Sequence, residues 1–207
     1  MKAPYGHADK ALKAIREEME EAFQTFSTTM GFDEMNYIDT RKAVTALYER
    51  LDAGIRRELR KVIRRVRKDA EDEIGFTMKD FDSAAFLLGL LKRPDPVTKY
   101  VYTREWNRKR DRLVESLMAS SGNQEVREAL NRALNVTMNQ VRQYADNVTD
   151  ETRIEVFSSA GIAKAMWNTQ RDGKVCAECA ERDGNIYEMG HLPDKHHRCR
   201  CFLTAVK

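Results

Sequence analysis

Five residues near the end of the chain carry side chains that bind soft metal ions. Cys176 and Cys179 form a C-x-x-C pair, and Cys199 and Cys201 form a C-x-C pair 20 residues later. His196 stands three positions before Cys199. Cysteine pairs on two separate turns are typical ligands of tetrahedral zinc, because each turn supplies two donors. The spacing therefore predicts a structural Zn²⁺ site.

The fourth zinc ligand has two candidates. Sulfurs bound to one zinc ion lie within about 4 Å of one another, since each is ~2.3 Å from the metal. Alternate residues of an extended strand, as in a C-x-C pair, do not approach so closely without a bend in the backbone. The predicted ligands are therefore Cys176, Cys179 and Cys199 with either His196 or Cys201, in that order of preference. We interpret His191 and His197 as surface histidines.

Two other states of the cysteines, a disulfide and buried free thiols, stay open as alternatives. Disulfides belong to oxidising compartments, and the N-terminal sequence lacks the apolar stretch of a secretory signal. A catalytic site is not predicted. Three thiolates close a zinc shell, no carboxylate cluster suggests a nuclease, and the C-x-x-C pair is assigned to a turn and not to the start of a thioredoxin-like helix. The sequence therefore indicates no enzyme.

The residues that precede the cysteines are predicted to be helical. In the N-terminal helical region, residues 1–94, apolar side chains recur every three or four positions from Leu12 to Met30 and from Val44 to Val66. The second helix would be on the order of 45 Å long, at ~1.5 Å per residue. Because a small domain cannot enclose such a rod, we expect part of its apolar stripe to pack on a partner or a second copy. Residues 77–80 are typical of a cap for a short helix that ends at Leu91.

Residues 95–161 are predicted to form a helical hairpin that turns near Gly122. A capping-box pattern from Thr152 to Glu155 indicates a last short helix, which Gly161 closes. This capping role accounts for Arg153 and Glu155 without any chemistry.

Residues 162–207 are predicted to form the Cys/His zinc-binding β module. Short alternating stretches at 165–169, 185–187 and 202–206 indicate strands. Asp-Gly pairs at 172–173 and 183–184 are hairpin-type turn signals. The expected fold class is mainly α, with an elongated helical N-terminal part and a small α+β C-terminal module, a zinc-stapled β-hairpin.

The residues around the cysteines resemble the C-terminal signature of a known family. From Trp167 to Cys179 the chain follows W-x-T-x-x-D-x-x-V-C-x-x-C, then D-G-x-x-Y from Asp183, and then H-x-x-C-R-C from His196. This pattern is similar to that of the phage Mu F-like minor head proteins, over about residues 95 to 207. His197 stands where the family usually has proline.

The resemblance implies a structural minor capsid protein of a tailed phage. Such a head morphogenesis protein is bound near the portal inside the head and aids assembly or DNA packaging and ejection. The implied partners are the portal protein, the major capsid protein and packaged double-stranded DNA, with several copies per virion. The implied location is the phage head, and the host cytoplasm during assembly. No apolar run reaches the ~20 residues that span a bilayer, so no membrane partner is expected.

A basic stretch suggests an alternative function. Eight of the thirteen residues from Arg56 to Lys68 are basic, although the whole chain has a net charge of only +3. This stretch is either a solvated helix face or a contact with DNA phosphates or an acidic portal surface. The candidate contact residues are Arg57, Arg60, Arg64 and Arg67. The alternative function is therefore a nucleic-acid-binding zinc module.

Overall fold

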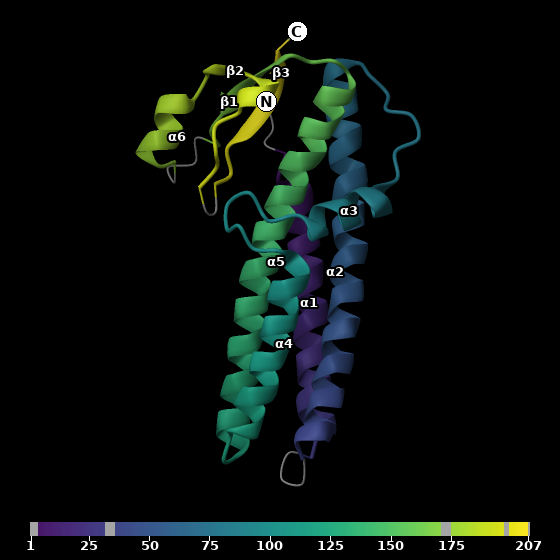
Figure 1. The fold of residues 1–207 in the computed structure, drawn as a ribbon, viewed down its shortest axis with the longest axis vertical. Coiled ribbons are helices and arrows are strands. Elements are labelled where there is room, and N and C mark those ends of the chain that lie inside the picture. Colours follow the sequence, from purple (N-terminus) through teal and green to yellow (C-terminus); the bar gives the residue numbers. More distant parts are fainter. Residues whose placement is uncertain (1–3, 32–35, 171–174, 197–198, 207) are drawn as a thin grey trace.

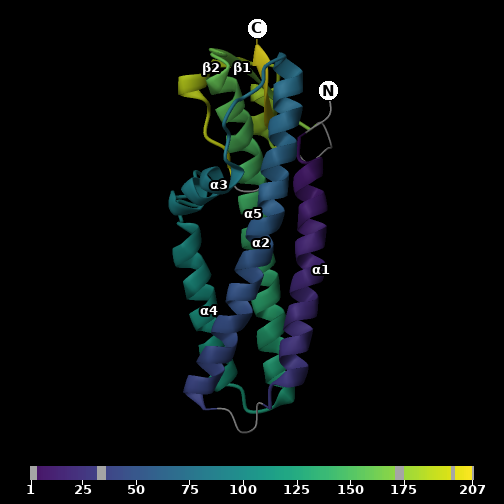
Figure 2. The same ribbon diagram turned by 90° about the vertical axis from the view of Figure 1, so that its right-hand side faces the viewer.

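The computed structural model describes residues 4–31, 36–170, 175–196 and 199–206. Four long helices run along the long axis, and a small sheet lies at one end of them (Figures 1 and 2). The long helices are α1 (Gly6–Thr29), α2 (Tyr37–Ile74), α4 (Tyr102–Met118) and α5 (Asn123–Ser159). The shorter elements are α3 (Ser83–Lys92), β1 (Lys164–Asn168), α6 (Ala177–Arg182), β2 (Ile186–Glu188), the 3₁₀ helix η2 (Met189–His191) and β3 (Phe202–Val206). The predicted fold class is confirmed.

Helix α2 is the central rod of the bundle. The side chain of Asn36 caps its N-terminus by accepting a hydrogen bond from the backbone N–H of Asp39 (3.0 Å), and Gly75, with φ of 70°, ends it. The apolar residues that form its stripe between Val44 and Val66 are at most 6% exposed, because α1, α4 and α5 pack around it. The expectation that part of this stripe packs on a partner or a second copy is therefore wrong.

Two predicted helix starts are corrected. Helix α3 begins after Asp82, whose carboxylate accepts hydrogen bonds from two backbone N–H groups of the first turn, and not at residues 77–80. Helix α5 continues through Thr152 without a break, so the capping box opens no new helix. The Thr152 hydroxyl instead donates a hydrogen bond back to the carbonyl of Val148 (2.6 Å). The predicted turn of the hairpin is confirmed, since α4 ends at Met118 and α5 begins at Asn123.

The sheet has the strand order β2-β1-β3, and both pairings are antiparallel. β1 is the central strand, and its residues Ala165 and Trp167 are buried in a small hydrophobic core that is separate from the core of the helical bundle. That core also contains Ile74 from the end of α2 and Phe157 from the end of α5. The sheet therefore packs on the ends of the two longest helices, and this packing positions the cysteines.

Candidate metal centre

The C-x-x-C pair lies at the start of helix α6. Cys176 is the N-cap residue, and its sulfur accepts a hydrogen bond from the backbone N–H of Cys179 (3.4 Å), which lies in the first turn. The assignment of both cysteines to a turn is therefore corrected. One of the two Asp-Gly turns, at Asp183 and Gly184, follows α6 with Gly184 at φ of 81°. The other, at 172–173, lies outside the described residues.

The remaining predicted ligands come from the segment that leads into β3. Cys199 and Cys201 both precede the first residue of that strand, Phe202. The backbone N–H of Cys199 donates a hydrogen bond to the carbonyl of His196 (3.1 Å). The sulfurs of Cys199 and Cys201 nevertheless lie within 4.8 Å of each other, so the geometric objection to a C-x-C pair does not apply here.

The ligand atoms form two overlapping groups that share Cys179. In the first, Nε2 of His196 lies 3.2 Å from Sγ of Cys176 and 3.1 Å from Sγ of Cys179. In the second, Sγ of Cys179 lies 3.7 Å from Sγ of Cys199, and the sulfur of Cys201 is also within 4.8 Å of both. A tetrahedral ion with metal–sulfur bonds of ~2.3 Å holds its sulfurs about 3.8 Å apart. This cluster could therefore bind a metal ion.

The protonation of the cluster also suits a cation. The thiol of Cys201 donates to the sulfur of Cys199, which lowers the pKa of Cys199 to about 5 and raises the pKa of Cys201 well above its ordinary value. Burial raises the pKa of Cys179 to about 12. The sulfurs of Cys179, Cys199 and Cys201 are therefore close enough for a proton on one to be shared with a neighbour. A metal ion replaces such protons, because thiolates are the form of cysteine that binds it.

Burial distinguishes the two ends of the cluster. Cys179, Cys199 and Cys201 are buried with Trp167 in the core of the sheet, whereas Cys176 and His196 lie at the surface. A site with a buried sulfur-rich side is typical of structural metal centres, where the ligands take the place of a larger hydrophobic core.

The two other histidines of this region are placed as far as the description allows. His191 is exposed and belongs to neither group of ligand atoms, as the surface interpretation predicts. His197 lies outside the described residues.

The N-terminal segment fastens the cysteine-bearing segment to the bundle. The buried Tyr5 hydroxyl donates to Oδ1 of Asp150 (2.7 Å) and lies 2.8 Å from the backbone carbonyl of Cys201. Lys195 contacts the same carbonyl and forms an ion pair with Asp150 (2.6 Å). Burial, and next the charge of Asp150, raises the pKa of Tyr5 well above its ordinary value. Sequence reasoning missed this network, because Tyr5 and Cys201 are 196 positions apart.

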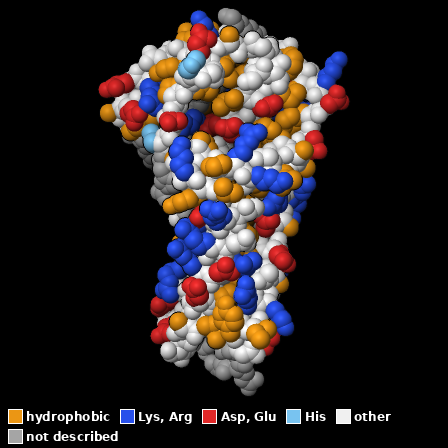
Figure 3. Space-filling model, viewed as in Figure 1, with side chains coloured by type: hydrophobic (Ala, Val, Ile, Leu, Met, Phe, Trp, Pro, Cys, Tyr) orange, Lys and Arg blue, Asp and Glu red, His pale blue; other side chains and the backbone are white. Residues whose placement is uncertain are grey.

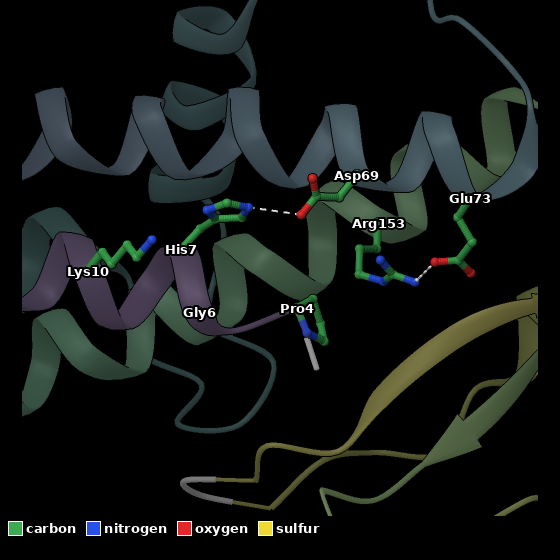
Figure 4. A pocket seen from close by; sticks show the side chains of 7 residues that line it. All are labelled: Pro4, Gly6, His7, Lys10, Asp69, Glu73 and Arg153. Carbon is green, nitrogen blue, oxygen red and sulfur yellow. Dashed lines mark hydrogen bonds and ion pairs between the residues drawn. The ribbon is translucent and has the colours of Figure 1, made fainter. Parts of the chain in front are cut away.

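Arg153 holds the free edge of β3. It is buried, forms an ion pair with Glu73 of α2 (2.6 Å), and donates from Nε and Nη2 to the carbonyl of Leu203. Glu73 in turn accepts the backbone N–H of Ala205 (3.1 Å). Figure 4 shows the Glu73–Arg153 pair at one side of a pocket beside this strand. The interpretation of Arg153 as part of a helix start is wrong, because α5 continues through this residue. Its side chain instead binds groups that the edge of β3 leaves unpaired.

The basic stretch of α2 is largely neutralised within the chain. Arg57 pairs with Glu18 and Glu58, and Nε of Arg67 lies 3.6 Å from Glu71. In the described part of the chain, Arg60 and Arg64 have no ion pair. Figure 3 shows that basic side chains also gather along the lower half of the face where α4 lies in front. Two of the four predicted contact residues are therefore available to an outside partner.

Comparison of the chain with protein families, with curated proteins and with solved structures finds no match. Among the described residues, no helix is long and apolar enough to cross a membrane.

Proposed function

We propose that this chain is a structural virion protein, a minor capsid component of a tailed phage whose C-terminal module is held together by zinc. The observation that supports the proposal is the spatial meeting of the residues that carry the resemblance. Trp167, Cys179, Cys199 and Cys201 lie far apart in the signature, yet they pack in one buried cluster. A signature that forms a core has a structural role.

The zinc ion has Cys176, Cys179, Cys199 and His196 as its ligands in this proposal. His196 is preferred over Cys201 because its Nε2 contacts both sulfurs of the C-x-x-C pair. A set of three thiolates and one imidazole leaves no open position, so the ion would supply folding energy and no chemistry. Apparent zinc binding energies in small structural sites are about 10–16 kcal/mol, so the module would depend on the ion.

Metal content and cobalt substitution test this assignment. Protein purified under reducing conditions should contain one zinc per chain, and its Co²⁺ form should show the absorption of a tetrahedral thiolate site. Cys179→Ser and His196→Ala should lose the metal, whereas the matched variant Cys201→Ser should retain it. A folded, metal-free module, or retention by His196→Ala with loss by Cys201→Ser, would contradict the assignment.

In the proposed role in the phage head, the chain binds the portal protein. Four long helices beside a stapled module make a rigid, elongated body, which suits attachment along another protein (Figure 2). The chain should co-purify with portal rings when it is coexpressed with the portal protein of the same phage, and it should sediment with filled heads. Cys179→Ser serves as the control, because it tests whether the intact module is needed. Absence of the chain from both portal rings and heads would contradict the proposal.

The alternative function, binding of DNA phosphates, has Arg60 and Arg64 in its favour. Each lost phosphate contact reduces the salt slope of duplex binding by about 0.9, so Arg60→Gln with Arg64→Gln should reduce it by about 1.8. The pair Arg127→Gln and Arg132→Gln removes the same charge from exposed positions of α5 and serves as the control. Equal effects of both pairs would show that only the net charge matters.

A further inference from the structure

A cavity of about 170 Å³ lies beside the metal centre, between α5, β1 and the segment that contains Lys195. This volume is several times the ~30 Å³ that one water molecule occupies in the liquid. Three acidic residues of α5, Asp146, Asp150 and Glu151, line it together with apolar side chains that include Ile154 and Leu192. The cavity therefore combines a negatively charged wall with an apolar one.

The carboxylates of this wall differ in whether they have partners. Asp150 is engaged by Tyr5 and Lys195. In the described part of the chain, no hydrogen bond or ion pair reaches the carboxylate of Asp146, although this residue is only 6% exposed. The same holds for Glu151, which is half-buried. Lys195 also lines the cavity, but its ion pair is with Asp150. Because a buried carboxylate without a partner is unfavourable, Asp146 and Glu151 are the acceptors that a further cation could bind.

Charges around Asp146 come from several elements. The pKa of Asp146 is raised to about 7, first by burial and then by the charges of Asp150 and of Asp9 on α1. Arg200 and Arg142 act in the opposite direction, but Arg200 is already paired with Asp9 (2.8 Å). Among the described residues, these two arginines offset the raised pKa of Asp146 only in part.

The arrangement favours an extended cation over a metal ion. Within the described residues, the groups of three or more metal-binding side chains with ligand atoms inside 4.8 Å consist of cysteines and His196 alone. The carboxylates of the cavity are thus spread too widely to surround a small ion. A guanidinium carries five N–H donors in a planar fork that can reach separated acceptors. The apolar wall suits the aliphatic stem of the same side chain.

We propose that this cavity binds an arginine side chain of a partner protein, with Asp146 and Glu151 as the acceptors. The site needs no metal ion inside it and does not depend on the head role, so it goes beyond the function proposed above.

The probe is N-acetylarginine amide, and its neutral isostere N-acetylcitrulline amide is the control ligand. Titration of the full chain as purified, with metal content measured in the same sample, is followed by the NMR signal of the Trp167 indole N–H, because Trp167 lines the cavity. The arginine derivative should shift this signal, and the citrulline derivative should not. Asp146→Asn should weaken binding at least tenfold, as should Glu151→Gln, which keeps the test valid if the first variant folds poorly.

The control variant is Asp72→Asn. Asp72 is exposed on α2, and its carboxylate lies 3.8 Å from the ammonium group of Lys68. It should leave the affinity unchanged. The proposal is overturned if the arginine derivative causes no shift, if citrulline binds equally well, or if neither Asp146→Asn nor Glu151→Gln weakens binding. A stronger response to N-acetyllysine amide or to Mg²⁺ alone would overturn the choice of a guanidinium.

Discussion

Replacement of Arg153 by methionine tests the role that the structure gives this residue, which differs most from the role that the sequence predicts. If Arg153 belonged to an exposed helix start, the substitution would change the free energy of unfolding by no more than about 0.5 kcal/mol. In the structure, the substitution removes an ion pair to Glu73 and two hydrogen bonds to the carbonyl of Leu203. Methionine keeps apolar packing against Phe157, whose ring lies 5.0 Å from the guanidinium carbon.

The expected loss of stability is about 3 kcal/mol. Loss of one partner from a buried ion pair destabilises a protein by about 3–5 kcal/mol. The lower end applies here because the side chain of Glu73 is 22% exposed, so water can solvate the carboxylate that is left behind. Leu203 would additionally keep a carbonyl without its donor.

Urea unfolding of the metal-saturated protein measures this loss, since metal binding itself contributes to stability. Glu73→Gln completes a double-mutant cycle, in which we expect a coupling energy of about 1–3 kcal/mol. Arg127→Met, at an exposed position of the same helix, is the control. A loss below about 0.5 kcal/mol for Arg153→Met, together with no coupling to Glu73, would refute the account of the β3 edge.

Three further predictions concern other positions. The pKa of Asp146 is raised to about 7, so the folded state binds this proton more tightly than the unfolded state does. The free energy of unfolding should therefore fall as the pH rises from about 4 to 7. Asp146→Asn should abolish up to about 4 kcal/mol of this fall, as urea unfolding at several pH values would show. A Cβ at Gly54 would lie 2.6 Å from the carboxylate of Glu18, so Gly54→Ala should stabilise α2 by about 1 kcal/mol in a Glu18→Ala background and by less in the native chain, as thermal unfolding would show. Tyr5→Phe removes a buried hydroxyl from Asp150 and should cost about 1–3 kcal/mol in the same assay, whereas an unchanged midpoint would contradict the N-terminal anchor.

The long helices could be predicted because their signals are local. Apolar residues at three- and four-residue steps define the buried faces of α1 and α2, and Gly75 ends α2. What the sequence could not show is which helices cover which stripe. The local pattern leads to the expectation that part of the stripe from Val44 to Val66 packs on a partner or a second copy. The packing of α1, α4 and α5 around that stripe depends on contacts between distant segments, which a local pattern does not reveal.

The errors at helix starts have a common physical cause. Polar residues such as Thr152 can cap a helix or bond backward within one, and the spacing to Glu155 is compatible with both. The apolar residues that face the core continue past Thr152 to Val156 and Phe157, which are fully buried. Burial of these two side chains favours a continuous α5. Helix α6 has only six residues and a cysteine as its N-cap residue, so none of the usual helix patterns predicts it.

The sequence predicts the residues of the candidate metal centre but not their surroundings. Cysteine spacing is visible in the chain itself, whereas Tyr5, Lys195 and Arg153 have ordinary local sequences. Each of them has a partner at least 80 positions away: Cys201 for Tyr5, Tyr5 for Lys195 and Glu73 for Arg153. Such residues are found only when the fold brings these segments together.

The small sheet depends on the helical bundle as well as on its cysteines. Three strands of at most five residues leave two edges and little core, which is marginal for independent stability. The free edge of β3 is satisfied by Arg153 and Glu73, which come from the two longest helices. Tyr5 and Lys195 hold the carbonyl of Cys201, while the sulfur of the same residue belongs to the cysteine cluster. One residue, Cys201, therefore joins the N-terminal segment to the candidate metal centre, so the anchoring of that segment and the geometry of the cluster depend on each other.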